Sequence, residues 1–153
     1  MAWEITWQGQ VESDWLDELD HVNFLAYQRV AEKGGEVFWT AVSGGLGFKE
    51  RHGTEYVLLE IHVRYLGELR LGEVVTLETA LLAHDDKRYQ LLHRLSRDSH
   101  VVCTVETVNL AFDLTTRRSM AFGPGTRAAL DTRSSKLDGV QAELPLKRMR
   151  TIA

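Results

Sequence analysis

Residues 14–30 read DWLDELDHVNFLAYQRV and join a polar loop to an apolar, periodic segment. From Phe24 to Ala41, apolar and small residues recur at spacings of three and four, which is typical of one buried face of an α-helix. Asn23 suits the N-cap of this helix, and 43-SGG-45 suits its end. The stretch therefore predicts a helix of about twenty residues. Its first turn follows directly on three aspartates, a glutamate and a histidine.

The segments on either side of this helix have the period-two pattern of β-strands. One such segment, 3–11, precedes the helix, and the others follow it at 56–66, 73–84, 88–97, 100–113 and 117–122, with a short helix expected at 126–133. The breaks between the later segments are too short for crossover helices, so these strands should form an antiparallel meander. One helix and one sheet bury each other's apolar faces only if the sheet curls around the helix. We therefore predict an α+β fold in which a curved, roughly five- to six-stranded antiparallel sheet wraps one long central helix.

Two adjacent glycines, Gly34 and Gly35, interrupt the middle of the predicted helix. Each costs about 1 kcal/mol relative to alanine in a helix interior. We expect a close approach of the helix to the sheet or to a partner chain as the compensation.

The composition bounds the size of the protein and the class of its partners. With 153 residues, of which 44% are hydrophobic, the chain suffices for about one domain. We expect that domain at 1–133 and a loosely ordered extension at 134–153. The net charge of -4 gives no basic field for nucleic acid or anionic lipid. The N-terminus lacks a signal-peptide pattern and no run approaches the ~18 apolar residues of a membrane span, so we expect a cytoplasmic protein.

The start of the predicted helix offers a site for a developing negative charge. Unpaired N–H groups and the helix dipole make a helix N-terminus suitable for stabilising an oxyanion. Asp20 or Asn23 can serve simply as caps there, whereas Asp17 lies too far upstream to be an ordinary cap. Spacing alone leaves a catalytic and a structural role for Asp17 equally open.

The segment 17-DELDHVNF-24, followed by LAYQRVAEKG, resembles the motif that opens the central helix of the 4-hydroxybenzoyl-CoA thioesterase-like hot-dog proteins. The resemblance extends over residues 3 to about 130 and agrees with the predicted element order. More narrowly, 60-EIHVRYLGELRLGE-73 and 80-ALLAHDDKRYQLLHRL-95 look like the betainyl-CoA thioesterase branch, which also occurs as an appended domain on carnitine dehydrogenases. The resemblance implies the hot-dog fold and an acyl-CoA thioesterase activity.

The resemblance also implies roles for the residues of the motif. Asp17 matches the catalytic carboxylate, which acts on the thioester carbonyl as a nucleophile or as a general base for water. The backbone N–H of Phe24 is expected to hold the thioester oxygen. His21 is a candidate for orienting water, and Asn23 for holding the carbonyl or capping the helix. Asp20 stands where many members have glycine, so a different loop backbone is expected, and Asp20 is the alternative carboxylate.

Coenzyme A would bind where cations can meet its phosphates. By the resemblance, Lys87 and Arg88, in the turn between two strands, are the candidates, and 117-RR-118 and 147-KR-148 are weaker ones. Such nucleotide contacts often come from a neighbouring subunit, and open sheet edges also favour association, so we expect a homodimer or homotetramer. No cofactor is expected, because the coenzyme A thioester is itself the substrate.

The acyl group and its pocket are less closely specified by the sequence. Aromatic faces hold a quaternary ammonium such as betainyl by cation–π attraction, which makes Trp15, Trp39 and Tyr65 candidates, although large aromatics are commoner in cores. His62 shares a strand face with two charged neighbours and is expected at a pocket wall or subunit interface, or as a structural histidine. His84 is a weaker candidate, and so is His93.

Three functions remain open at this point. The leading hypothesis is an acyl-CoA thioesterase for a short or polar acyl group, with betainyl-CoA as the sharper guess. An enoyl-thioester hydratase or dehydratase is the second, but it usually goes with a D-x-N-P-x-H pattern, and no proline lies between Asp17 and His21. A non-catalytic acyl-CoA-binding module is the third. No metal site or nucleophilic serine is expected, because the chain has no H-E-x-x-H, cysteine pair or G-x-S-x-G.

Overall fold

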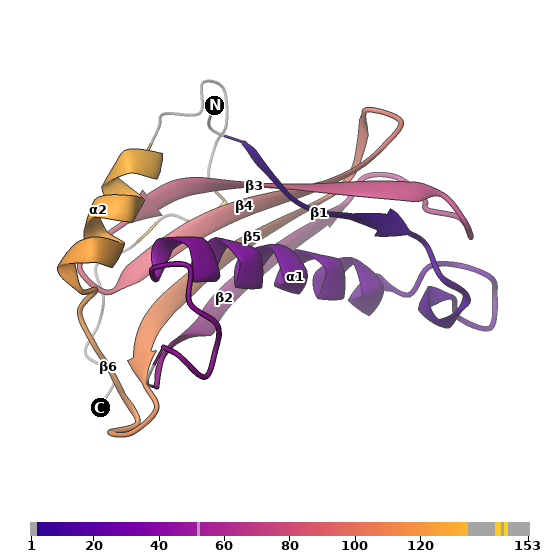
Figure 1. The fold of residues 1–153 in the computed structure, drawn as a ribbon. Helices are drawn as coiled ribbons and strands as arrows, with labels where there is room; N and C mark the ends of the chain where they lie inside the picture. The colour runs from indigo at the N-terminus through magenta and orange to yellow at the C-terminus, as the bar shows by residue number, and fades with distance from the viewer. Residues whose placement is uncertain (1–2, 52, 135–142, 145, 147–153) are drawn as a thin grey trace.

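The computed structural model describes residues 3–51, 53–134, 143–144 and 146 and has one long helix against a six-stranded antiparallel sheet (Figure 1). In chain order the elements are β1 (Glu4–Gln10), the 3-10 helix η1 (Ser13–Trp15), α1 (Phe24–Val42), β2 (Thr54–Tyr65), β3 (Val74–His84), β4 (Arg88–Arg97), β5 (His100–Asp113), β6 (Arg118–Ser119) and α2 (Pro124–Arg133). The strand order is β1-β3-β4-β5-β2, with β6 paired to β5. The predicted architecture is therefore confirmed, and β1 and β2 are the two edges of the main path.

The last predicted strand, 117–122, is much shorter than expected. Only Arg118 and Ser119 pair with β5, and Arg117 has a positive φ of 60° in the turn before them. The chain then leaves β5, because the N–H of Phe122 donates to Asp86 O at the β3–β4 turn and the Phe122 side chain packs beside Tyr89. Burial of one aromatic side chain thus ends the strand early.

The helix approaches the sheet most closely at Gly34. A Cβ at this position would lie 2.5 Å from Leu77 Cδ2, 2.8 Å from Thr6 Oγ1 and 3.0 Å from Thr79 Oγ1. No side chain fits in that space without a shift of its neighbours. The close approach to the sheet that the paired glycines predicted is confirmed for Gly34. Gly35 leaves more room, since its nearest neighbour would be Tyr56 Oη at 3.4 Å.

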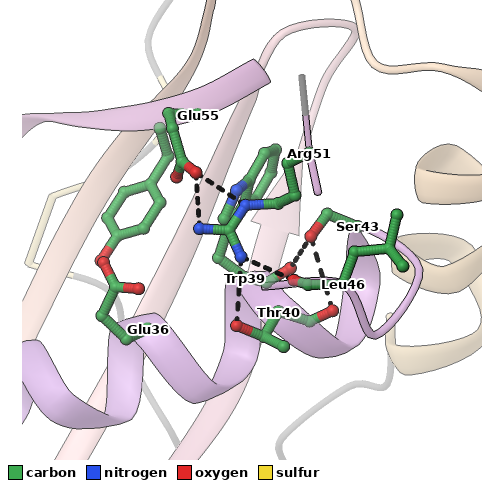
Figure 2. Close-up of polar contacts among 8 residues, drawn as sticks. Glu36, Trp39, Thr40, Ser43, Leu46, Arg51 and Glu55 are labelled. Carbon is green, nitrogen blue, oxygen red and sulfur yellow. Dashed lines mark hydrogen bonds and ion pairs between the residues drawn. The ribbon is translucent and has the colours of Figure 1, made fainter. Parts of the chain in front are cut away.

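The loop between α1 and β2 is fixed by a buried arginine (Figure 2). Arg51 Nη2 lies 2.5 Å from Glu55 Oε1, and Arg51 Nε donates to the same oxygen at 2.7 Å. Arg51 Nη1 donates to Leu46 O at 2.8 Å and to Thr40 Oγ1 at 3.4 Å, which joins the loop to the last turns of α1. The guanidinium therefore holds the C-terminal end of the helix, the loop and the start of β2 together.

Most of the expected C-terminal extension, 134–153, lies outside the described residues. Where it is described, the backbone N–H groups of Glu143 and Leu144 donate to the carboxylate of Glu106 on β5, at 2.8 and 3.1 Å. Glu106 is only 3% exposed. Within the part of the chain that the structure describes, no helix is long and apolar enough to cross a membrane.

Candidate active site

The polar stretch before α1 forms a closed loop that the Asp17 side chain holds together. Leu16 and Val22 face each other in an isolated antiparallel bridge, and the Asp17 N–H donates to His21 O at 2.8 Å. Asp17 Oδ1 accepts the N–H groups of Leu19 at 2.8 Å and His21 at 3.0 Å. The side chain is exposed, and its other oxygen, Oδ2, has no hydrogen-bond partner among the described residues. One carboxylate oxygen is thus structural and the other is available for chemistry.

Asp20 takes a backbone conformation that glycine adopts readily. Its φ is 57°, in the left-handed region that costs most residues energy but that aspartate tolerates. The Asp20 N–H donates to Asp17 O at 3.1 Å, and its side chain is exposed. Aspartate thus takes here a backbone conformation that glycine would also take without strain.

The start of α1 is capped and accessible. Asn23 Oδ1 accepts the N–H of Leu25 at 2.8 Å, so Asn23 acts as the N-cap. The N–H of Phe24 has no partner within the helix, because it belongs to the first helical residue. Phe24 is 60% exposed. The Tyr65 hydroxyl donates to Phe24 O at 3.0 Å, so Tyr65 ties the end of β2 to the helix start.

Two cavities meet at the N-terminal turns of α1, and both are lined by Leu25 and Arg29. The first, of about 510 Å³, lies between α1 and the inner face of the sheet. The residues that matter for its chemistry are Glu32, Glu36, Tyr56, His93, Thr107 and Asn109. The second, of about 410 Å³, lies beside η1 and is lined by Trp7, Trp15 and Lys33 among others. Of the predicted aromatics, Trp15 thus lies at a cavity, whereas Trp39 is 1% exposed and stacks on Tyr89 in the core.

The predicted coenzyme A contacts lie far from the Asp17 loop in a single chain. Lys87 and Arg88 follow β3, whose other end begins beside the segment that leads into that loop (Figure 1). Eleven strand residues at about 3.3 Å each separate the two ends by roughly 30 Å. In a single chain, Asp17 and Lys87 are therefore too far apart to contact neighbouring groups of one ligand.

The two basic residues of this turn differ in their contacts. Arg88 is 9% exposed, and its guanidinium contacts Asp85 Oδ2 at 2.6 and 2.8 Å. Burial alone would raise the pKa of Asp85, but hydrogen bonds from Lys87 and Arg88 outweigh it and lower that pKa. Among the residues that the structure describes, Lys87 Nζ makes one long contact, of 3.5 Å, with Ser119 Oγ. Lys87 is accordingly the more accessible cation of the pair.

The predicted histidines lie in three different places. His62 lies opposite Glu106 in the pairing of β2 with β5. Successive side chains of a strand point to opposite faces, and the neighbouring Ile61 lines the first cavity, so His62 lies on the sheet face away from α1. His84 Nε2 lies 2.9 Å from Asp131 Oδ1 and joins β3 to α2. The side chain of His21 is exposed. None of these three is among the lining residues of either cavity.

His93 lies in a different place from the other three predicted histidines. It lines the first cavity yet is only 1% exposed. Tyr89, Leu91, His93 and Leu95 alternate along β4 toward α1, so a histidine in the inward register of an apolar strand was the available signal. Among the described residues, no group of three metal-ligating side chains occurs.

Comparisons with known proteins agree with this geometry. Residues 11–130 match the family model of the Thioesterase-like superfamily. The L-carnitine dehydrogenase/betainyl-CoA thioesterase of Agrobacterium fabrum is 29% identical over 133 residues, which are 86% of this chain and 27% of that protein. The betainyl-CoA thioesterase of Pseudomonas aeruginosa is 27% identical over 90 residues, or 59% of this chain and 57% of that protein. The chain thus spans about a quarter of the length of the Agrobacterium relative.

A solved structure supports the fold. A Staphylococcus aureus protein in complex with CoA superposes with a TM-score of 0.77 at 23% identity, covering 95% of this chain and 98% of that one. The resemblance drawn from residues 17–24 is therefore confirmed at the level of family and hot-dog fold.

Proposed function

Because the chain belongs to the Thioesterase-like superfamily, we propose that it is an acyl-CoA thioesterase that hydrolyses a short, polar acyl-CoA, betainyl-CoA first among them. Water and the thioester give the free carboxylic acid and coenzyme A, so the reaction needs no bound cofactor. The observation that carries the proposal is the Asp17 carboxylate, held through one oxygen in an exposed loop that leads directly into the open start of α1.

Asp17 supplies the attacking side of the reaction. Its Oδ2 either attacks the thioester carbon, giving a mixed anhydride that water then hydrolyses, or removes a proton from the attacking water. In both routes the C–S bond breaks and the thiolate leaves as coenzyme A after protonation. In this proposal His21, which is exposed in the same loop, orients the water.

The helix start stabilises the charge that develops on the carbonyl oxygen. The Phe24 N–H has no intrahelical partner and lies at the positive end of the helix dipole. A backbone donor of this kind is worth more in the transition state than in the ground state, because the oxygen gains negative charge there. Asn23 contributes by capping the helix and so fixes the direction of the Phe24 N–H.

Coenzyme A binds across two subunits in this proposal. β2 is an edge of the sheet with exposed apolar side chains at Leu58, Leu59 and Ile61, which suits pairing with β2 of a second copy. Antiparallel pairing would bring the Asp17 end of one sheet beside the Lys87 end of the other. Lys87 then meets the nucleotide phosphates, while Arg88, already paired with Asp85, positions the turn.

The betainyl group is supported by the relatives and by the chemistry of the first cavity. Both relatives carry betainyl-CoA thioesterase in their names. The carboxylate of Glu32 lines the cavity two turns into α1, and a permanent cation gains from such a neighbour.

Thiol release from a panel of acyl-CoAs tests the proposal. The panel contains betainyl, acetyl, medium-chain, long-chain and 4-hydroxybenzoyl thioesters, each with wild type, Asp17→Asn and, as a matched exposed acid, Asp14→Asn. We expect hydrolysis of short polar thioesters that falls by roughly a hundredfold or more in Asp17→Asn and is unchanged in Asp14→Asn. Full activity of Asp17→Asn would remove Asp17 from the mechanism. Binding of coenzyme A without turnover of any thioester would indicate a binding module, and a change in enoyl absorbance without thiol release a hydratase.

A further inference from the structure

The second cavity begins beside the two reactive groups of the proposed mechanism. Leu16, which precedes Asp17, lines this cavity. Asn23 and Leu25, which flank Phe24, line it as well. Betainyl carries its nitrogen two bonds from the carbonyl carbon, about 2.5 Å away. With the carbonyl oxygen at the Phe24 N–H, the trimethylammonium therefore lies close to the helix start, and the side chains that contact it must be sought there.

Trp15 is held next to the helix start by the backbone. In the antiparallel bridge that closes the loop, Trp15 lies opposite Asn23, whose N–H donates to Trp15 O at 2.7 Å. Residues paired in this way have Cα atoms about 5.5 Å apart. The Trp15 side chain is half-buried and lines the second cavity together with Asn23. The indole is therefore within reach of an acyl group whose carbonyl binds at the Phe24 N–H.

A second tryptophan fixes the Trp15 ring. The centroids of the Trp7 and Trp15 rings lie 6.1 Å apart at an interplanar angle of 35°. Gly9 leaves room for the Trp7 ring, because a Cβ there would lie 2.4 Å from Trp7 Cζ2. The Trp7 ring already contacts a cation, since Lys33 Nζ lies 5.2 Å from its centroid. The indole pair is thus in position before a ligand binds, which lowers the cost of binding.

The charged residues of the second cavity balance one another. Glu12 and Asp14 line it from the side of η1, and Arg29 and Lys33 line it from α1. With two acidic and two basic side chains, the lining has no net charge that would favour a cation over a neutral group of the same shape. The π-face of an indole does make that distinction, because the quadrupole of the ring attracts a cation. Recognition of a cation in this cavity therefore falls to Trp15.

We infer that Trp15 is a specificity-determining residue, whose indole ring contacts the trimethylammonium of the acyl group while the carbonyl oxygen lies at the Phe24 N–H. The inference rests on the proposed thioesterase function and places the acyl group in the second cavity. Glu32 lies in the first cavity, about 12 Å along α1 from Phe24, and attracts the cation over that longer distance. Trp39 lines neither cavity and is buried in the core.

A pair of substrates of the same shape isolates the charge. Betainyl-CoA has a nitrogen where 3,3-dimethylbutyryl-CoA has a carbon, so only the first is cationic. Because the charge also activates the thioester itself, the measured quantity is the betainyl to dimethylbutyryl ratio of kcat/KM, compared between variants. We expect Trp15→Leu to lower this ratio by about tenfold, and Trp15→Phe to lower it less. Trp3→Leu is the matched control and should leave the ratio unchanged, because the Trp3 ring stacks on Arg94 at 3.9 Å and lines neither cavity.

Fluorinated tryptophans at position 15 separate the electrostatics of the ring from its packing. Each added fluorine weakens the negative potential over the ring face and hardly changes the shape of the side chain. The ratio should therefore fall stepwise from tryptophan to mono-, di- and trifluorotryptophan, while kcat/KM for the dimethylbutyryl thioester stays nearly constant. A structural role of Trp15 predicts no such trend. This series also decides the matter if Trp15→Leu does not fold.

The outcomes separate this inference from the function on which it rests. A wild type that hydrolyses none of the thioesters contradicts the thioesterase function itself. A wild type that hydrolyses both substrates, with a ratio that changes neither in Trp15→Leu nor in the fluorinated series, contradicts the inference alone. Hydrolysis of the dimethylbutyryl thioester but not of betainyl-CoA also overturns the inference. A ratio that falls in Glu32→Gln but not in Trp15→Leu would place the cation in the first cavity instead.

Discussion

The carboxylate of Asp17 accepts the backbone N–H of His21 at 3.0 Å, so the candidate nucleophile also closes the loop that leads into α1. The same oxygen, Oδ1, accepts the N–H of Leu19. Asparagine keeps an acceptor oxygen in this position but loses the negative charge, whereas alanine loses both. The two substitutions therefore separate the chemistry of Asp17 from its structural role.

We expect Asp17→Ala to lower the free energy of unfolding by about 1–2 kcal/mol, because two loop N–H groups lose their partner. Asp17→Asn should change the free energy of unfolding by less than about 0.5 kcal/mol while lowering thiol release by roughly a hundredfold or more. Urea unfolding at neutral pH measures both. Equal stability of Asp17→Ala and wild type would show that the two hydrogen bonds do not hold the loop.

The positive φ of Asp20 gives a second prediction. Glycine takes this conformation at little cost, whereas a β-branched residue does not. Asp20→Gly should therefore keep wild-type activity and stability within about 1 kcal/mol, and Asp20→Val should lose about 1–2 kcal/mol of stability. Thiol release and thermal unfolding check the pair. A large loss of kcat in Asp20→Gly would instead make Asp20 the catalytic carboxylate.

The two helix glycines form a matched pair of sites. Gly34→Ala places a methyl group 2.5 Å from Leu77 Cδ2, and we expect a net loss of about 1–2 kcal/mol after the gain in helix propensity. Gly35→Ala meets only Tyr56 Oη, at 3.4 Å, so it should gain up to about 1 kcal/mol. Chemical denaturation of both variants tests this contrast. Stabilisation by Gly34→Ala would mean that the helix can move away from β3 at no cost.

The spacing of apolar residues along the chain predicted most of the fold, because burial of one face sets the residue pattern along a whole helix or strand. The helix begins at Phe24 and is capped by Asn23, as the pattern indicated, since a cap is a local interaction. Residues 74–79 of β3 and 91–96 of β4 alternate between buried and more exposed positions, as the period-two pattern indicated, whereas residues 105–111 of β5 are all buried. Cys103, in the apolar run of β5, is fully buried, and burial raises its pKa to about 12, so its thiol stays protonated and unreactive.

The site was harder to predict, because it depends on contacts between distant segments. His93 is hydrogen-bonded to Thr79, which contacts Thr6, and no spacing within β4 reports these partners on two other strands. Arg88 looked available in the turn, but its partner, Asp85, depends on the turn geometry. The role of Tyr65 as an anchor of the helix start follows from where β2 ends, 41 residues after Phe24.

Loss of the Arg51–Glu55 ion pair, which lies far from the Asp17 loop, should lower the free energy of unfolding strongly. The side chains of Arg51 and Glu55 are 3% and 10% exposed, so Arg51→Met leaves a buried carboxylate without its cation and should cost about 3–5 kcal/mol. Arg70→Met is the surface control, because the Arg70–Glu68 pair is 78% and 52% exposed and is worth about 0–1 kcal/mol. Equilibrium unfolding of both variants measures the difference. Adding Glu55→Gln to Arg51→Met should recover part of the loss, and no recovery would show that packing, not charge, dominates.

The buried histidine links stability to pH. Burial lowers the pKa of His93 from its usual 6.5 to about 4 in the fold, so the unfolded chain binds more protons between these two values. The stabilisation is fully present above pH 6.5 and is lost as the pH falls through about 4. At about 1.4 kcal/mol per pH unit, we expect wild type to lose about 2 kcal/mol between pH 7 and pH 5 from this group. Urea unfolding at both values, with His93→Gln as the non-titrating control, should show a shallower pH dependence in the variant. Parallel pH profiles of the two proteins would mean that burial does not lower the pKa of His93 in the fold.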